Sequence, residues 1–173
     1  MRPIVRPRTM RLQQGIGYGT LAGTCCAEER YLSRMIQVEN AAPRYLENIS
    51  IGPHRLQVDE PVEAGGADAG PSPYELILAA LGTCTSISVR MYAERKQWPL
   101  ESVRVALTHA KVHADDCAAC DTEVRAIDRI EMEISLSGPL SESQRSRLLD
   151  IASRCPVHRT LAAGLQIRTR SVD

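Results

Sequence analysis

The chain has 173 residues, of which 43% are hydrophobic and 24% are charged, and its 21 Lys and Arg residues balance its 21 Asp and Glu residues. This composition is typical of a globular domain and excludes a disordered tail or a collagen-like fibre. The zero formal net charge and the 3% aromatic content argue against nucleic acid or an anionic membrane surface as a partner.

The first 27 residues contain four arginines and no acidic residue, but they lack the apolar segment of a secretory signal. We therefore predict a flexible extension at residues 1–33, followed by one domain at 34–173. The longest apolar run, residues 76–82, is much shorter than the ~20 residues that span a bilayer, so no membrane span is expected. Six cysteines are too few for a disulfide-stapled secreted domain of this length, which predicts a reducing, cytoplasmic setting.

The first predicted elements form an antiparallel meander. Three strands are expected at residues 35–38, 45–51 and 54–59, with turns at 41–44 and 52–53. The next segment, residues 60–71 (EPVEAGGADAGP), is rich in Gly, Ala and acidic residues. Its length is typical of a functional lid or of a crossing segment.

A long helix is predicted at residues 73–96. Ser72 is a favourable N-cap, Pro73 suits the first helical position, and Glu75 completes a capping box. The first half of this helix is apolar on all sides, which predicts burial in a large core or under a partner subunit.

The rest of the chain is predicted to hold two long strands, a second helix and a last strand. Apolar and polar residues alternate at 102–113 and 127–136, a second capping box at Ser141 and Gln144 opens a helix to about residue 154, and residues 164–170 close the chain as a strand. The predicted order is therefore β-β-β-α-β-β-α-β. Because the strands are grouped and do not alternate singly with helices, this order indicates an α+β fold.

Two cysteines stand in settings that suit thiol chemistry. Cys84 falls in the middle of the long helix, where a free thiol often acts as a small core side chain. Cys155 lies at the end of the second helix, with Pro156 at the first position of a possible next helical turn and His158 and Arg159 close behind. A thiol at a helix N-terminus beside cationic groups is favoured as a thiolate, so Cys155 is either a nucleophile, a resolving thiol or a structural residue.

Each of these cysteines lies in a distinctive segment, Cys84 at the end of GGADAGPSPYELILAALGTC (residues 65–84) and Cys155 within RCPVH (residues 154–158). Together the two segments strongly resemble the OsmC/Ohr superfamily of thiol-dependent hydroperoxide reductases, and the resemblance covers residues 34 to 170. It implies an intertwined homodimer with buried central helices and two equivalent sites at the subunit interface.

The resemblance also implies a role for each thiol. Cys84 is the peroxidatic thiol, which attacks an organic hydroperoxide and becomes a sulfenic acid, and Cys155 is the resolving thiol, which then forms a disulfide with it. A thiol or lipoyl-type reductant resets the pair by exchange. No metal, flavin or haem cofactor is required.

In this superfamily the thiolate is activated by an Arg of the first hairpin, held by a Glu ten residues before the helix cysteine. That position is Tyr74 here and Glu75 follows it, so the sequence has PYEL where the pattern has PEEL, as in a divergent branch. A shift of one residue turns a helical side chain by ~100°, and Glu75 also serves the capping box. Arg44 is the preferred cation and Arg55 its alternative. Arg44 and Glu75 thus join the two cysteines as candidate catalytic residues.

Two other readings of the site chemistry stay open. The displaced glutamate also suits a non-enzymatic module, in which the interface pocket holds a small apolar or thiol-reactive ligand and the cysteines sense oxidation. Cys117 and Cys120 form a C-x-x-C pair close to His113 and His109, which suits zinc, an auxiliary redox pair or an inert loop. Because no second C-x-x-C pair is present, no metal site is predicted.

Overall fold

A computed structural model describes residues 35–113 and 126–171 of the chain. The described residues belong to one compact unit, Arg34–Asp173. The extension predicted at residues 1–33 lies outside the described residues, and so do Cys117 and Cys120. Predictions about these segments stay predictions.

The first sheet contains three antiparallel strands in the order β1 (Ile36–Asn40), β2 (Glu47–Ile51) and β3 (His54–Val58). Its register pairs Ile49 of the central strand with Val38 on one side and Leu56 on the other. Ile49 and Val58 are buried, while the side chains of β1 are exposed. The predicted meander is therefore confirmed.

The loop after β3 is organised around the buried carboxylate of Asp59. This side chain, 1% exposed, accepts hydrogen bonds from the backbone N–H groups of Glu60 (2.8 Å), Ala67 (2.9 Å) and Ala69 (3.2 Å). Burial acts to raise the pKa of the carboxyl group, but the three N–H donors outweigh it and hold the pKa below its ordinary value. Gly66 is required within this loop, because a Cβ there would lie 1.8 Å from the carbonyl oxygen of Glu60.

We expect Asp59→Asn to lower the thermal midpoint by on the order of 5 °C, because an amide cannot accept all three hydrogen bonds of the carboxylate. The folded pKa lies below the unfolded one, so this stabilisation is present above the unfolded pKa of about 3.9 and is lost as the pH falls through the lower folded value. Thermal melts of both proteins should therefore differ at neutral pH and converge in acid. The matched control is Asp68→Asn, an exposed position of the same loop, and an equal loss there would contradict the assignment.

Helix α1 (Pro73–Lys96) begins and ends at the residues that the sequence predicts. The Ser72 hydroxyl accepts from the Glu75 N–H, and the Glu75 carboxylate accepts from the Ser72 N–H at 2.7 Å. At the other end Gln97 adopts the left-handed conformation and donates its N–H to the carbonyls of Ala93 and Glu94. The predicted capping box and helix limits are confirmed.

One side of α1 is buried within the chain and the other is not. The helix packs against β4, α2 and α3 through a stripe that includes Leu81, Thr85, Val89 and Ala93. Large apolar side chains remain exposed on its other sides, among them Ile77, Ile87 and Met91. By length and composition alone α1 could also cross a membrane, with a mean hydropathy of 1.4 over 18 residues. A core helix of a globular protein meets the same criterion. In α1, 28% of this 18-residue window is buried, and the helix packs on β4, α2 and α3.

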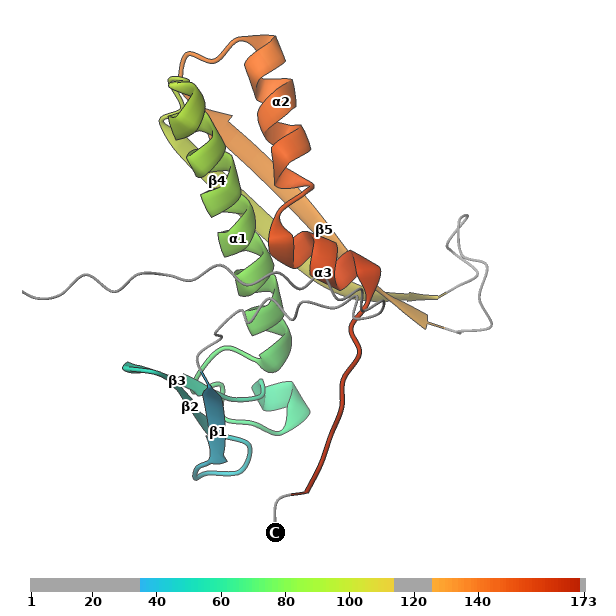
Figure 1. Cartoon of the computed structure of the whole chain (residues 1–173). Helices are drawn as coiled ribbons and strands as arrows, with labels where there is room; N and C mark the ends of the chain where they lie inside the picture. The colour runs from blue at the N-terminus through green and yellow to red at the C-terminus, as the bar shows by residue number, and fades with distance from the viewer. Residues whose placement is uncertain (1–34, 114–125, 172–173) are drawn as a thin grey trace, which may run out of the picture. The chain divides into compact units, whose positions relative to one another are not determined.

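The second sheet is a long hairpin of β4 (Ser102–His113) and β5 (Ala126–Ser137). Its antiparallel register runs from Ser102 opposite Ser137 to His113 opposite Ala126. Helix α1 lies against this hairpin (Figure 1). The two strands are those that the alternating pattern predicts.

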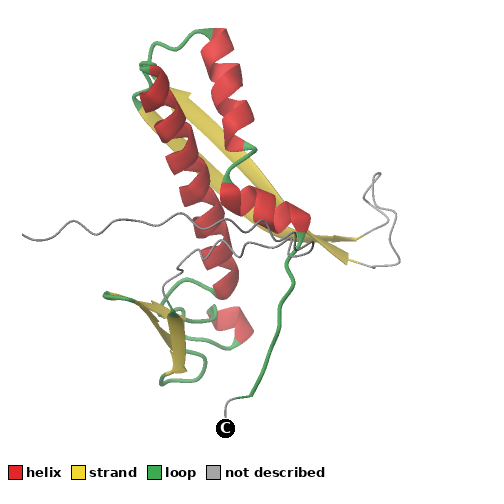
Figure 2. Cartoon of the chain, viewed as in Figure 1, coloured by secondary structure: helices red, strands yellow, loops and turns green. Residues whose placement is uncertain are grey.

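Helix α2 (Glu142–Ala152) follows the hairpin and closes the core. It opens with the predicted capping box, in which the Ser141 hydroxyl accepts from the Gln144 N–H and the Gln144 side chain accepts from the Ser141 N–H. The buried core cluster joins it to α1 and comprises Val89, Ala93, Leu140, Leu148 and Ala152. Helices and strands are thus segregated along the chain, as Figure 2 shows, and the α+β class is confirmed.

The predicted order is wrong at its end. A third helix, α3 (Pro156–Ala163), follows Cys155 directly, and residues 164–170 form no strand. A strand needs a neighbour that pairs its N–H and C=O groups, and the described chain offers none to this segment. Its alternating apolar residues, Leu165 and Ile167, are exposed.

Candidate active site

Cys84 lies at mid-length of α1, on the border between its buried and exposed sides. Its half-buried side chain lines a groove of about 520 Å³, together with residues that are mostly apolar: Ala79, Ala80, Thr83, Ile87, Ser88, Met91 and Pro156. No Arg or Lys is among these described residues. The groove can therefore accept an apolar group next to a thiol.

Cys155 is the N-cap residue of α3 and is almost fully buried, at 1% exposure. Its sulfur accepts a hydrogen bond from the His158 N–H at 3.3 Å, as a Ser or Asp oxygen does at an ordinary N-cap. A second hydrogen bond joins the same sulfur to the Thr85 hydroxyl, also at 3.3 Å. Pro156 occupies the first helical position, where the missing N–H costs nothing.

The structure brings these two cysteines together. The Cys155 thiol is close enough to Cys84 to raise the pKa of the Cys84 thiol, and both are free thiols. Cys84 comes from the middle of α1 and Cys155 from the junction of α2 and α3, so packing of these helices creates the pair. The arrangement can hold the two sulfurs as a dithiol or, after oxidation by two electrons, as a disulfide.

The surroundings of Cys84 favour its neutral form. Burial raises the pKa of the thiol, and the neighbouring Cys155 thiol raises it further. The Val157 N–H and the Ser88 hydroxyl act in the opposite direction as hydrogen-bond donors, without reversing the rise. A thiolate at this position needs further positive charge.

Neither of the two predicted activating residues lines the groove at Cys84. The Arg44 guanidinium, in the turn after β1, donates to the carbonyl of Gly65 at 3.1 Å. Glu75 is held in the capping box, where the Ser72 N–H and hydroxyl lower the pKa of its carboxyl group. Within the described chain, the predicted set of four residues therefore separates into two neighbouring thiols and two residues that are bound elsewhere.

The predicted histidine and cysteine constellation is described only in part. The His109 Nε2 atom lies 2.8 Å from the Asp128 carboxylate, and the ring stacks on Tyr74 with the ring centroids 4.6 Å apart. Cys117, Cys120 and the side chain of His113 lie outside the described residues. Among residues 35–113 and 126–171, no group of three potential metal ligands is found.

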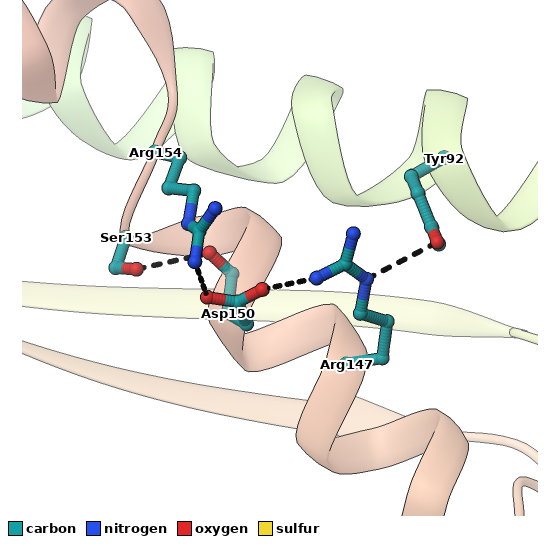
Figure 3. A network of polar contacts seen from close by, with 5 residues as sticks. All are labelled: Tyr92, Arg147, Asp150, Ser153 and Arg154. Atoms are coloured by element: carbon teal, nitrogen blue, oxygen red, sulfur yellow. Dashed lines mark hydrogen bonds and ion pairs between the residues drawn. The ribbon is translucent and has the colours of Figure 1, made fainter.

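A polar network fixes the turn that carries Cys155 (Figure 3). The Asp150 carboxylate pairs with Arg147 of α2 and, at 2.6 Å, with Arg154. Arg147 Nε also donates to the Tyr92 hydroxyl of α1 at 3.2 Å, and the Ser153 hydroxyl donates to the Asp150 carbonyl. The residues just before Cys155 are thereby tied to α1, the helix that carries Cys84.

Sequence reasoning missed one of the two hydroxyl groups at this site. Ser88 lies one turn after Cys84, and the i, i+4 spacing of the sequence already places it on the same helix face. Thr85 has no such signal, because its contact with Cys155 joins residues far apart in the chain.

The fold and the site together define an α+β protein with a paired dithiol. A family model described as OsmC-like protein matches residues 65–170, and the chain belongs to this family. The family includes proteins with roles in hydroperoxide resistance and redox chemistry. Comparison with curated protein sequences finds no significant match.

Solved structures with a similar fold match about three quarters of this chain over most of their own length. An OsmC-like protein from Mycoplasma pneumoniae shares 18% identity over 75% of this chain and 86% of its own, with a TM-score of 0.59. An organic hydroperoxide resistance protein from Legionella pneumophila shares 17% identity over 76% of this chain and 90% of its own, with a TM-score of 0.57. A putative organic hydroperoxide resistance protein from Vibrio cholerae, with captopril bound in one active site, shares 16% identity over 76% of this chain and 87% of its own, with a TM-score of 0.52. At these identities the likeness concerns the fold.

Proposed function

We propose that this protein reduces organic hydroperoxides through a thiol and disulfide cycle of Cys84 and Cys155. The observation that carries the proposal is the proximity of two free thiols at the edge of an apolar groove. Membership in the OsmC-like family supports it, because the family includes proteins of hydroperoxide resistance.

The cycle begins at Cys84, whose sulfur faces the groove. As a thiolate it attacks the distal oxygen of the hydroperoxide, the O–O bond breaks, and the alkoxide takes up a proton and leaves as an alcohol. The sulfur loses two electrons and becomes a sulfenic acid. The Cys155 thiolate then attacks the Cys84 sulfur, an S–S bond forms, and hydroxide leaves and is protonated to water.

A thiol or lipoyl-type reductant completes the cycle by exchange with the disulfide. The cycle uses no metal, flavin or haem. We place it in a reducing, cytoplasmic compartment, where such a dithiol is kept ready for oxidation.

We further propose that the working form is a homodimer with a dithiol site in each half. The exposed apolar residues of α1, among them Ile77, Ile87 and Met91, call for a partner surface. The unpaired segment after α3, with Leu165 and Ile167 exposed, also suits contact with a second copy.

Disulfide mapping tests the proposed function directly. The reduced protein is mixed with one equivalent of cumene hydroperoxide or hydrogen peroxide, quenched by thiol alkylation, and digested for mass spectrometry. We expect a Cys84–Cys155 bridge that forms faster with the alkyl hydroperoxide, because the groove accepts its apolar group. If both thiols stay free, or only Cys117 and Cys120 pair, the proposed function is wrong.

The thiolate at Cys84 needs a cation, and we propose that Arg44 supplies it across the dimer interface, with Glu75 as its acidic partner. Arg44→Met should raise the pH midpoint of Cys84 alkylation by about one unit, since an adjacent cation favours the charged form. At neutral pH the thiolate fraction, and with it the alkylation rate, falls about tenfold.

Two variants sharpen this test. Arg55→Met is the matched control, because the Arg55 guanidinium donates to the carbonyls of Gly52 and His54 in its own turn, and it should leave the midpoint unchanged. Glu75→Gln removes the charge but keeps a capping-box side chain. An Arg44→Met profile that matches the wild-type profile would show that Arg44 does not activate the thiol.

A second candidate function is non-enzymatic binding of a small apolar or thiol-reactive ligand. It is favoured by the raised pKa of Cys84 and by the apolar lining of the groove beside it. A ligand retained at stoichiometry by the purified protein, together with no turnover of any hydroperoxide, would support this function over the first.

A further inference from the structure

Thr85 is a fully buried polar residue at the contact between α1 and α3. Its side chain is 0% exposed, and its hydroxyl makes a single side-chain hydrogen bond within the described residues, to the Cys155 sulfur at 3.3 Å. The same sulfur accepts the His158 N–H at 3.3 Å. A hydroxyl and a helix N-terminal amide therefore converge on one thiol.

The two partners act differently when Cys155 changes its protonation state. A hydroxyl rotates, so Thr85 can accept from the neutral S–H group and donate to the thiolate. The His158 N–H is a fixed donor at the N-terminus of α3, where negative charge is favoured. Because Cys155 is shielded from water, these donors take the place of hydration for its charged form.

We propose that Thr85 is a positioning residue for the resolving step, which holds the Cys155 sulfur toward Cys84 and stabilises its thiolate. The inference rests on the proposed dithiol cycle and assigns a residue to its second step. In that step Cys155 gives an electron pair to the sulfenic sulfur of Cys84, the S–O bond breaks, and hydroxide departs and is protonated. Thr85 touches neither the hydroperoxide nor the departing oxygen.

The charged side chains near Cys155 in the sequence are directed elsewhere. Arg154 pairs with Asp150, the His158 ring lines a separate cavity beside β5, and Arg159 is exposed. The one titratable group that faces the Cys155 sulfur from α1 is the thiol of Cys84. Within the described chain, the hydrogen-bond partners of the Cys155 sulfur are therefore the neutral hydroxyl of Thr85 and the N–H group of His158.

Two substitutions separate the hydroxyl from the shape of the side chain. Thr85→Val keeps the branched shape and removes the hydroxyl, whereas Thr85→Ser keeps the hydroxyl and removes the methyl group. Thr85→Ala gives a second hydroxyl-free variant in case valine disturbs the packing. Each reduced full-length protein is oxidised between pH 6 and 9, either with cumene hydroperoxide or with diamide, a thiol oxidant that needs no peroxide chemistry. Formation of the Cys84–Cys155 bridge is followed by acid quench and peptide mapping.

We expect the bridge to form about tenfold more slowly in Thr85→Val at neutral pH, with the pH profile of its formation displaced upward by about one unit. With the hydroperoxide, sulfenic acid should accumulate at Cys84 in this variant. Thr85→Ser should follow the wild-type profile. A merely structural role would instead make the serine variant slower than the valine variant and leave the pH profile in place.

The two oxidants keep this inference separate from the proposed function. If the wild-type protein forms the bridge with diamide but its Cys84 is not oxidised by the hydroperoxide, the peroxidase proposal is wrong. The diamide rates of the variants then still support or refute the role of Thr85. Equal diamide rates and equal pH profiles for the wild-type, Thr85→Val and Thr85→Ala proteins would overturn the role of Thr85.

Discussion

Cys84→Ser should lower hydroperoxide turnover by on the order of 1000-fold or more, because serine lacks a nucleophile that ionises near neutral pH. Cys155→Ser should impair a different step of the cycle. In this variant Cys84 should still be oxidised by one equivalent of hydroperoxide, because the substitution removes a thiol that raises the pKa of Cys84. Turnover then stalls because no internal thiol condenses with the sulfenic acid. Steady-state assays with a lipoyl-type dithiol and single-turnover mass spectrometry distinguish the two variants.

The matched control for this pair is Cys25→Ser, in the segment predicted to be an extension. It changes a cysteine that the proposed cycle does not use, and we expect wild-type turnover. Full turnover by Cys84→Ser would remove Cys84 from the peroxidatic role. A Cys155→Ser protein that turns over as fast as the wild type would show that an external thiol, and not Cys155, resolves the sulfenic acid.

The local signals in the sequence were sufficient to predict most of the fold. Ser72 and Ser141 each precede a helix and sit three residues before Glu75 and Gln144, and both capping boxes form. Such interactions involve neighbouring residues only, so they can be predicted without the tertiary structure. The alternation that predicts β4 and β5 is similarly local.

The end of the chain shows the limit of local reasoning. Residues 164–170 alternate like a strand, but a strand also requires a partner, and pairing is a property of the tertiary or quaternary structure. Helix α3 was predicted only as a possible next turn at Pro156, for another reason. Its N-cap is Cys155, a residue type outside the usual set of Ser, Thr, Asp and Asn, although Pro156 at the first helical position was a valid signal.

The candidate site was predictable as a pair of motifs but not as a geometry. The family resemblance singled out Cys84 and Cys155, while their proximity depends on how α3 packs on α1. Thr85 carries no motif and became visible only through its distance to the Cys155 sulfur. Arg44 and Glu75 show the converse, because each is bound away from the thiols. The Glu75 capping box was predictable from neighbouring residues, whereas the Arg44 contact with the Gly65 carbonyl joins residues far apart in the chain.

Helix α2 packs on α1 through Leu148, which is fully buried in the cluster with Val89 and Ala93 of α1. Leu148→Ala should lower the free energy of unfolding by about 3 kcal/mol, from lost burial and from the cavity that remains. The matched control is Leu149→Ala, the same change at the next residue, which is 45% exposed and should cost less than about 1 kcal/mol. Urea unfolding at one fixed protomer concentration measures both, because assembly would couple stability to concentration.

The same pair of variants links the core to the dithiol. Helix α2 ends just before Cys155, so loosening its contact with α1 should expose the buried thiol more often. Alkylation of Cys155 should therefore speed up in Leu148→Ala and stay near the wild-type rate in Leu149→Ala. If both variants lose equal stability, α2 does not pack through Leu148. If Leu148→Ala is destabilised but the alkylation rate of Cys155 is unchanged, the thiol is held by the first turn of α3 and by Thr85, independently of α2.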